Sequence, residues 1–351
     1  LTSGNWDTTA HHLYDPRRMS FDASVALREA VAEKMSFPEY KPAKDYMVRI
    51  QGPMAADVER VFASLWQYQL DKQVLYADLS TPAVIHALPE PITPGPNVVQ
   101  AQLLMTIPAP FHRYGVLEVL ERAIARAQSY ILIEDQYMRS PRLTNALKAR
   151  MSAVPNLKLM VMTNPISEWT DPACWQTQVE NKILSQLFPT RFRTYRLRSF
   201  DAVDTQCTFC VNEVLASFHN HYMHSKLVII DDLFLEVGSA NHNNRSLLYD
   251  AEMAVAVNGA EWVRNAREQV TKEILGKYYK KGLTPDALFE KMEAVADVNQ
   301  LVYELWEDLD FEKNLNGAPV QGYLKPGGYL YPLTFGTPEN CSLENVGADI
   351  M

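Results

Sequence analysis

The chain has 351 residues, with 33 Lys and Arg against 42 Asp and Glu, which gives a net charge of −9 with neutral histidines. This length allows about two domains and more than one buried core. Hydrophobic residues make up 47% of the chain and charged residues 21%, values that exclude a collagen-like or disordered protein. The acidic balance makes nucleic acid an unlikely obligate partner, because affinity for phosphate polymers comes mainly from Lys and Arg.

No apolar run approaches the roughly 18 residues that a membrane-spanning helix needs, so we expect a soluble protein. The first residue is Leu1 rather than Met, and no signal-peptide pattern follows it. Cys207 and Cys210 form a lone CxxC, and Cys174 and Cys341 have no neighbour in sequence. This pattern offers no paired zinc half-sites, and the cysteines are interpreted as loop thiols or one local disulfide.

Helical and strand-like patterns alternate along the chain. In chain order, we expect a strand at 46–50, a helix at 55–67, a Pro-rich connector at 82–96, a strand at 103–107, a helix at 115–128, a strand at 130–134, a helix at 142–151, a strand at 157–162, a helix at 175–187 and a strand at 192–197. This alternation predicts an α/β fold in which helices cover a sheet.

The second half continues with two apolar runs, 227–230 and 234–237, which are close enough to form a hairpin. A strand at 252–257, a helix at 262–279 and a helix at 287–306 follow. The tail is rich in Gly, Pro and aromatic residues, among them Tyr323, Tyr329, Tyr331 and Phe335. We expect these aromatic residues to pack in the core, and a membrane-interface patch is the alternative.

Residues 221–255 concentrate side chains that can act on a phosphate ester. His224 and Lys226 are two positions apart, so on a strand they project to the same side and bring an imidazole next to a fixed cation. Asp231 follows, and then Gly238-Ser239-Ala240-Asn241. Lys226 would neutralise phosphate oxygens, while Asn241 and Ser239 would donate hydrogen bonds to them.

The imidazole of His224 can attack phosphorus or move a proton near neutral pH, and its second nitrogen needs an acceptor. Asp250 and Glu252 begin the next predicted strand. Because side chains alternate along a strand, only one of these two carboxylates can face His224, and the spacing does not decide which.

The pattern HxKxxxxD followed by GSxN resembles the signature of the phospholipase D superfamily. The stretch through Arg245-Ser246 and Asp250-x-Glu252 is similar to the C-terminal catalytic motif of the two-motif, eukaryotic-like phospholipases D. The resemblance implies that His224 is catalytic and paired with Glu252, and that Lys226 and Asn241 bind the phosphate. It also implies that Asp231, a member of the catalytic motif, supports the fold of that motif.

The resemblance extends to two other segments. Residues 131–137 look like the IENQ-type strand of these enzymes, and Gln136, like Asp250, is expected to lie behind the reacting groups. Residues 1–15 are similar to the segment that follows the first catalytic motif, although Asn5 stands where Arg is usual. Asp15 matches the carboxylate that orients the first catalytic histidine.

Phospholipases D use two HxKxxxxD motifs, and this sequence holds one. We expect the other motif on an upstream segment or a separate chain; a homodimer that brings two copies of His224 together is the alternative. The implied fold is α/β, a pseudo-two-fold pair of mixed sheets flanked by helices. Residues 1–95 would be the rest of the first half, 96–281 the second half, and 282–351 an extension.

The implied reaction is hydrolysis of the distal phosphodiester of a glycerophospholipid, through a phosphohistidine, to phosphatidic acid and the head-group alcohol. His224 is expected to be the general acid and then the base. No cofactor is expected, and the substrate partner is a phospholipid membrane surface. Nuclease action, phosphatidyl transfer to an alcohol, or an inactive half-enzyme are the alternatives. Similar bacterial enzymes are often secreted, but nothing in the sequence marks export.

Overall fold

The computed structural model describes residues 2–4, 43–72, 98–165, 174–205, 213–309, 312–314 and 324–335. Within these ranges, eleven strands form one large mixed sheet. The strand order is β13 (Glu312–Asn314), β8 (Glu213–Asn220), β7 (Phe192–Thr205), β6 (Lys158–Met162), β5 (Tyr130–Glu134), β10 (Leu227–Ile230), β11 (Phe234–Gly238), β12 (Glu252–Asn258), β3 (Gln100–Ile107) and β4 (Arg113–Tyr114), and β14 (Leu330–Pro332) pairs with β7.

The centre of this sheet is parallel, and its flanks are antiparallel. Strand β5 runs parallel to β6, and β6 runs parallel to β7. The helices α4 (Pro141–Ala153) and α5 (Cys174–Leu187) make the two crossovers that such parallel pairs require. Ser140 begins α4 as its N-cap, because its side chain accepts a hydrogen bond from the backbone N–H of Leu143.

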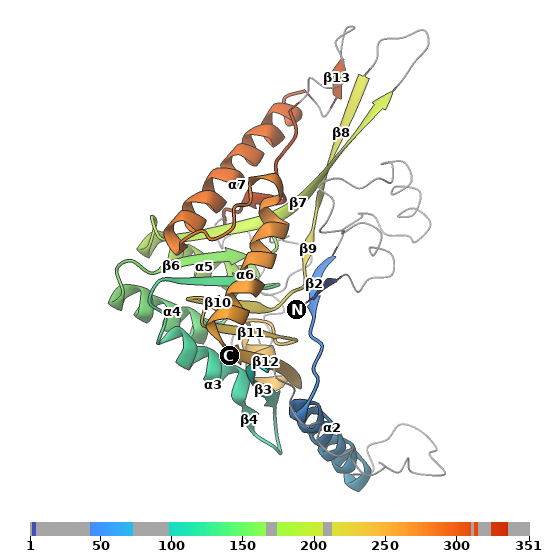
Figure 1. The fold of residues 1–351 in the computed structure, drawn as a ribbon, viewed down its shortest axis with the longest axis vertical. Coiled ribbons are helices and arrows are strands. Elements are labelled where there is room, and N and C mark those ends of the chain that lie inside the picture. Colours follow the sequence, from blue (N-terminus) through green and yellow to red (C-terminus); the bar gives the residue numbers. More distant parts are fainter. Residues whose placement is uncertain are drawn as a thin grey trace.

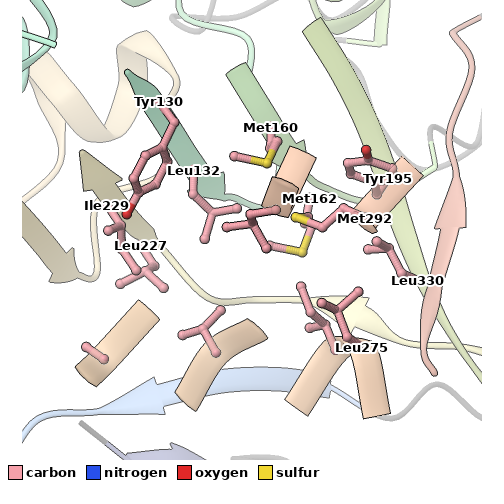
Figure 2. Close-up of a cluster of buried hydrophobic side chains, with 14 of the residues drawn as sticks. Tyr130, Leu132, Met160, Met162, Tyr195, Leu227, Ile229, Leu275, Met292 and Leu330 are labelled. Atoms are coloured by element: carbon pink, nitrogen blue, oxygen red, sulfur yellow. The ribbon is translucent and has the colours of Figure 1, made fainter. Parts of the chain in front are cut away.

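Helices cover both faces of the sheet, as Figure 1 shows. One face carries α3 (Gly115–Ile124), α4 and α5, and the other carries α6 (Ala260–Leu275) and α7 (Pro285–Glu307). The alternation of strand side chains separates the two cores: Ile131 and Ile133 belong to the first, Tyr130 and Leu132 to the second. In Figure 2, residues of the second core from β5, β6, β7 and β10 gather with Leu275 and Met292 of the helices.

A second, small sheet connects the beginning of the chain to the motif. Strand β1 (Thr2–Gly4) pairs antiparallel with β2 (Ala43–Met47), which pairs parallel with β9 (Tyr222–Met223). The helix α2 (Pro53–Lys72) follows β2 and points away from the large sheet (Figure 1). Because β9 immediately precedes His224, this small sheet brings residues near position 45 to the candidate site.

The predicted α/β class, with a mixed sheet flanked by helices, is confirmed. The hairpin of β10 and β11 forms as expected, and Tyr329 and Tyr331 are buried in the core. Several elements differ from the prediction. Strand β2 begins at Ala43 and ends at Met47, β7 continues to Thr205, and β8 was not predicted. Strand β8 forms by pairing with the extension of β7, a contact that the local pattern does not reveal.

Two other predictions, the Pro-rich connector and the placement of Tyr323, lie outside the described residues. The other half of the expected pseudo-two-fold pair would come from residues 1–95, which are described only at 2–4 and 43–72. Two short helical segments complete the described fold, a π-helix at Arg245–Tyr249 and a 3-10 turn at Gly276–Tyr278. In the part of the chain described here, no helix has the length and apolar character to cross a bilayer.

Candidate active site

The site is centred on His224, which follows the two-residue strand β9. The backbone N–H of His224 donates to the carbonyl of Lys44 on β2 at 2.9 Å. Its Nδ1 lies 2.7 Å from Oδ2 of Asp45, whose side chain is only 9% exposed, whereas the imidazole is 42% exposed. The next residue of β2 after the backbone contact therefore supplies the carboxylate that holds the ring.

This contact gives the two ring nitrogens different roles. An ionised carboxylate accepts hydrogen bonds and donates none, so Nδ1 of His224 carries a proton when it faces Asp45. The other nitrogen, Nε2, is then the atom that could accept a proton from, or return one to, a bound molecule.

The predicted pairing of Glu252 with His224 is replaced by the pairing of Asp45 with His224. Glu252 instead accepts a hydrogen bond from the hydroxyl of Ser239 at 2.5 Å. Burial raises the pKa of Glu252, and the hydrogen bond from Ser239 opposes that shift. Asp250 lies 3.0 Å from the guanidinium of Arg245. Asp45 lies 179 positions from His224 along the chain, so no local spacing points to this contact.

Lys226 lies just before β10 and is 4% exposed. Its ammonium donates to the backbone carbonyl of His224. Burial lowers the pKa of Lys226, while the negative charges of Asp135, Asp45 and Glu252 act to raise it. The ammonium of Lys226 therefore lies next to the backbone of His224 and in the field of three carboxylates. A cation at this place could bind a phosphate anion.

The turn after β11 brings Ser239 and Asn241 to the same end of the sheet. A Cβ on Gly238 would lie 2.4 Å from the Cβ of Ala254 and 2.5 Å from the carbonyl oxygen of Met253, so only glycine fits between β11 and β12. The hydroxyl of Ser239 donates to Glu252 and accepts from the N–H of Met253 at 3.0 Å. The side-chain oxygen of Asn241 is buried and has no hydrogen-bond partner among the described residues.

Asp231 lies at the opposite end of β10 from His224. Its carboxylate accepts hydrogen bonds from the backbone N–H groups of Gln128, Ser129 and Tyr130, at 2.6, 2.8 and 2.9 Å. The residue has a φ of 56°, in the left-handed region that Asp and Asn tolerate. Asp231 therefore holds the start of β5 against the turn after β10 and does not face the imidazole.

Gln136 supports an aromatic side chain beside the imidazole. Its amide nitrogen donates to the hydroxyl of Tyr222, and also to the hydroxyl of Tyr137 at 2.8 Å. The ring of Tyr222 is stacked against that of His224, with centroids 6.2 Å apart and an interplanar angle of 23°. Tyr222 is 37% exposed, so its ring forms part of the surface next to the imidazole of His224.

Sequence reasoning missed Asp45 and Tyr222. A signal for Asp45 exists in the sequence: Asp45 precedes Gly52 by seven positions, Glu252 precedes Gly259 by seven positions, and each glycine stands just before a helix. Asp45 and Glu252 thus share the same spacing to a glycine that precedes a helix. Asp15 lies outside the described residues. Within the described ranges, no group of three or more His, Cys, Asp or Glu residues is arranged to hold a metal ion.

Comparison with known proteins agrees with the motif. Residues 120–274 match a family model described as the phospholipase D-like domain of cardiolipin synthase. No curated protein sequence matches the chain.

Three solved structures are similar at low levels. The phospholipase D family member Nuc from Salmonella typhimurium is 15% identical, with a TM-score of 0.34, and the match covers 50% of this chain and 93% of Nuc. NucT from Helicobacter pylori is 16% identical, with a TM-score of 0.36 and coverage of 50% and 96%. Phosphatidylserine synthase from Haemophilus influenzae Rd KW20 is 17% identical, with a TM-score of 0.35 and coverage of 53% and 40%. Similarity at this level says nothing about the substrate.

The matched range contains His224, Lys226, Asp231, Ser239, Asn241 and Glu252, together with the strands that carry them. Enzymes with this domain are phosphodiesterases or phosphatidyltransferases, and both reactions occur at a phosphodiester. Residues 120–274 are therefore a phosphodiesterase-like domain of the phospholipase D superfamily.

Proposed function

We propose that the protein is a phospholipase D, which hydrolyses the distal phosphodiester of a glycerophospholipid to phosphatidic acid and a head-group alcohol. The observation that supports this proposal most is the contact between Nδ1 of His224 and Asp45, next to the buried Lys226. It leaves Nε2 as the proton-transferring atom beside a cation suited to phosphate oxygens.

In the proposed first step, a nitrogen of a second histidine attacks phosphorus. A nitrogen–phosphorus bond forms, the bond from phosphorus to the head-group oxygen breaks, and Nε2 of His224 gives its proton to that oxygen. In the second step, Nε2 takes a proton from water, the water oxygen bonds to phosphorus, and the nitrogen–phosphorus bond breaks. Lys226 and the amide of Asn241 would stabilise the charge on the nonbridging oxygens in both steps.

We place the second histidine on an upstream segment or a second chain, and we propose Glu252, in place of Asp15, as the carboxylate that orients it. Glu252 corresponds to Asp45 in its spacing to the following glycine and helix. Its carboxylate is among the charges that act on Lys226, which supports a place for Glu252 on the same side of the site. On this proposal residues 1–95 remain part of the first half, 96–281 form the second half, and 282–351 are an extension.

The test is a direct comparison of substrates with the purified protein. Vesicles of phosphatidylcholine and phosphatidylethanolamine and single-stranded DNA are supplied in parallel, and phosphatidic acid, free head group and cleaved DNA are measured. We expect phosphatidic acid and head group in equal amounts, and their loss in His224→Ala. Cleavage of DNA alone would contradict the proposal and indicate a nuclease. Phosphatidyl transfer to an added alcohol without hydrolysis would contradict it and indicate a phosphatidyltransferase.

Native mass spectrometry of the same sample tests the source of the second histidine. We expect an additional polypeptide segment that carries HxKxxxxD. A homodimer of this chain with full activity would assign that role to the partner's copy of His224. A monomer of this chain with full activity would contradict the two-histidine mechanism.

A further inference from the structure

A buried polar cluster lies directly behind the contact between His224 and Asp45. It consists of Lys44 and Tyr46 of β2, Glu134 at the end of β5, and Ser225 of the motif. The ammonium of Lys44 lies 2.5 Å from Oε2 of Glu134, and both side chains are 0% exposed. The hydroxyl of Tyr46 donates to Oε1 of Glu134 at 3.0 Å, and that of Ser225 donates to Oε2 at 2.6 Å.

The cluster binds the two segments that form the catalytic pair. Side chains alternate along a strand, so Lys44 and Tyr46 point to the opposite side of β2 from Asp45. Ser225 stands between His224 and Lys226 in the sequence, and its side chain contacts Glu134. One carboxylate, that of Glu134, therefore contacts the reverse sides of both the strand that carries Asp45 and the motif that carries His224.

Few backbone contacts join β2 to the motif, although β2 also pairs with β1 on its other side. Strand β2 pairs with β9 at two positions, Ala43 with Tyr222 and Lys44 with Met223, and one further bond joins the N–H of His224 to the carbonyl of Lys44. A shift of β2 by one residue would turn the side chain of Asp45 to the other face. Such a shift would also leave the buried charge of Glu134 or Lys44 without its partner, which is strongly unfavourable.

We propose that Glu134 is a positioning residue: through Lys44 and Tyr46 it sets the register of β2 against the motif and thereby keeps Asp45 on Nδ1 of His224. Glu134 touches neither substrate nor the imidazole in this role. The inference rests on the proposed function only where it concerns catalysis. The contact between Asp45 and Nδ1 of His224 can be observed without turnover.

The test reads the tautomer of His224 by nuclear magnetic resonance of protein labelled with 15N at histidine. Long-range proton–nitrogen spectra distinguish a ring protonated at Nδ1 from one protonated at Nε2, and the His224 signals are assigned by their loss in His224→Ala. We expect the Nδ1-protonated pattern in the unmodified protein. Asp45→Asn and Glu134→Gln should both lose it, and the double variant should look like Asp45→Asn alone.

The matched control is Glu236→Gln, because Glu236 is also a fully buried glutamate of the large sheet but lies on β11, which pairs with β10 and β12. It should keep the Nδ1 pattern. If circular dichroism shows that Glu134→Gln does not fold, Tyr46→Phe is the variant that tests the proposal. It removes one hydroxyl that contacts Glu134, and it should shift part of the His224 population away from the Nδ1-protonated form. An unchanged His224 spectrum in a folded Glu134→Gln or Tyr46→Phe variant would overturn the proposal.

The same spectra separate this inference from the proposed function. A protein with the expected tautomer changes that cleaves no phospholipid would retain the positioning role and lose the phospholipase D assignment. A protein that cleaves phosphatidylcholine but whose His224 spectrum is the same with and without Glu134→Gln would retain the phospholipase D assignment. It would lose the positioning role of Glu134.

Discussion

Oδ2 of Asp45 lies 2.7 Å from Nδ1 of His224, across 179 positions of sequence. A motif in the second half of the chain thus depends on a carboxylate from a strand near its beginning. The contact sets the tautomer of the imidazole, and with it the atom that can exchange a proton with substrate.

Asp45→Asn should therefore lower kcat for phosphatidylcholine by about 10²- to 10⁴-fold, since an amide can favour the wrong tautomer and does not stabilise the imidazolium. The measurement is release of choline at saturating substrate, with folding checked by circular dichroism. Asp57→Asn, on the exposed part of α2 and paired with Arg60, is the control that should keep the full rate. A rate within a few-fold of the unmodified protein would remove Asp45 from the mechanism.

Asp231→Asn should affect stability and leave catalysis intact. Asparagine tolerates the positive φ of this position, so the change mainly weakens the three hydrogen bonds from the backbone of residues 128–130. Loss of charge-assisted bonds of this kind costs about 1–3 kcal/mol of unfolding free energy. Urea denaturation measures the cost, and kcat per folded molecule should not change. A folded but inactive variant would place Asp231 among the reacting groups.

Glu236 should make the protein less stable at high pH. It is fully buried, and burial raises its pKa to about 8, with the charge of Asp135 adding to the shift. In the unfolded chain Glu236 loses its proton near pH 4.3, so the unfolding free energy should fall as pH rises from there to about 8, by up to about 1.4 kcal/mol per pH unit. Below that window both states are protonated and this cost disappears.

Denaturation of Glu236→Gln at a series of pH values checks this contribution. The variant should be more stable than the unmodified protein at pH 8 and nearly equal to it at pH 4. Glu121→Gln, which alters the exposed pair with Arg142, serves as the control and should show no such difference. If the unfolding free energy of Glu236→Gln and of the unmodified protein depended on pH in the same way, Glu236 would not cause the loss of stability at high pH.

Gly238→Ala should destabilise the end of β11, because the added Cβ would overlap Ala254 and the backbone of Met253. Overpacking of this kind costs about 1–3 kcal/mol. Thermal melting measures the loss. Gly259→Ala is a suitable comparison, since its Cβ would meet Val99 at 3.4 Å, an ordinary contact. Equal melting temperatures for the two variants would mean that β11 and β12 can separate at no cost.

The sequence pattern was sufficient for the elements whose signals are local. The strand at Tyr130–Glu134, the hairpin of β10 and β11, and the helices on both faces follow from periodicity and turn residues. The polar end of the strand at 130–134 also required partners, and Glu134 has them in Lys44, Tyr46 and Ser225.

The sequence pattern could not predict contacts between residues that lie far apart along the chain. Asp45 stands on a strand of five residues in a sheet held by two positions of pairing with β9, and nothing near Asp45 signals that its partner is His224. The expected pairing with Glu252 came from the family resemblance, because the local spacing did not decide between Asp250 and Glu252. Strand β8 was missed for the same reason, because its stability comes from pairing with β7.

The central claim, that His224 protonates the leaving head group, is tested most directly by changing the leaving group. Phosphatidylcholine needs a proton on the departing oxygen, whereas a phosphatidyl ester of p-nitrophenol does not, because nitrophenolate leaves as an anion. We predict that His224→Ala lowers the single-turnover rate with phosphatidylcholine by more than about 10³-fold and the rate with the nitrophenyl ester far less. Equal losses with both substrates, or an unchanged rate with phosphatidylcholine, would contradict the account.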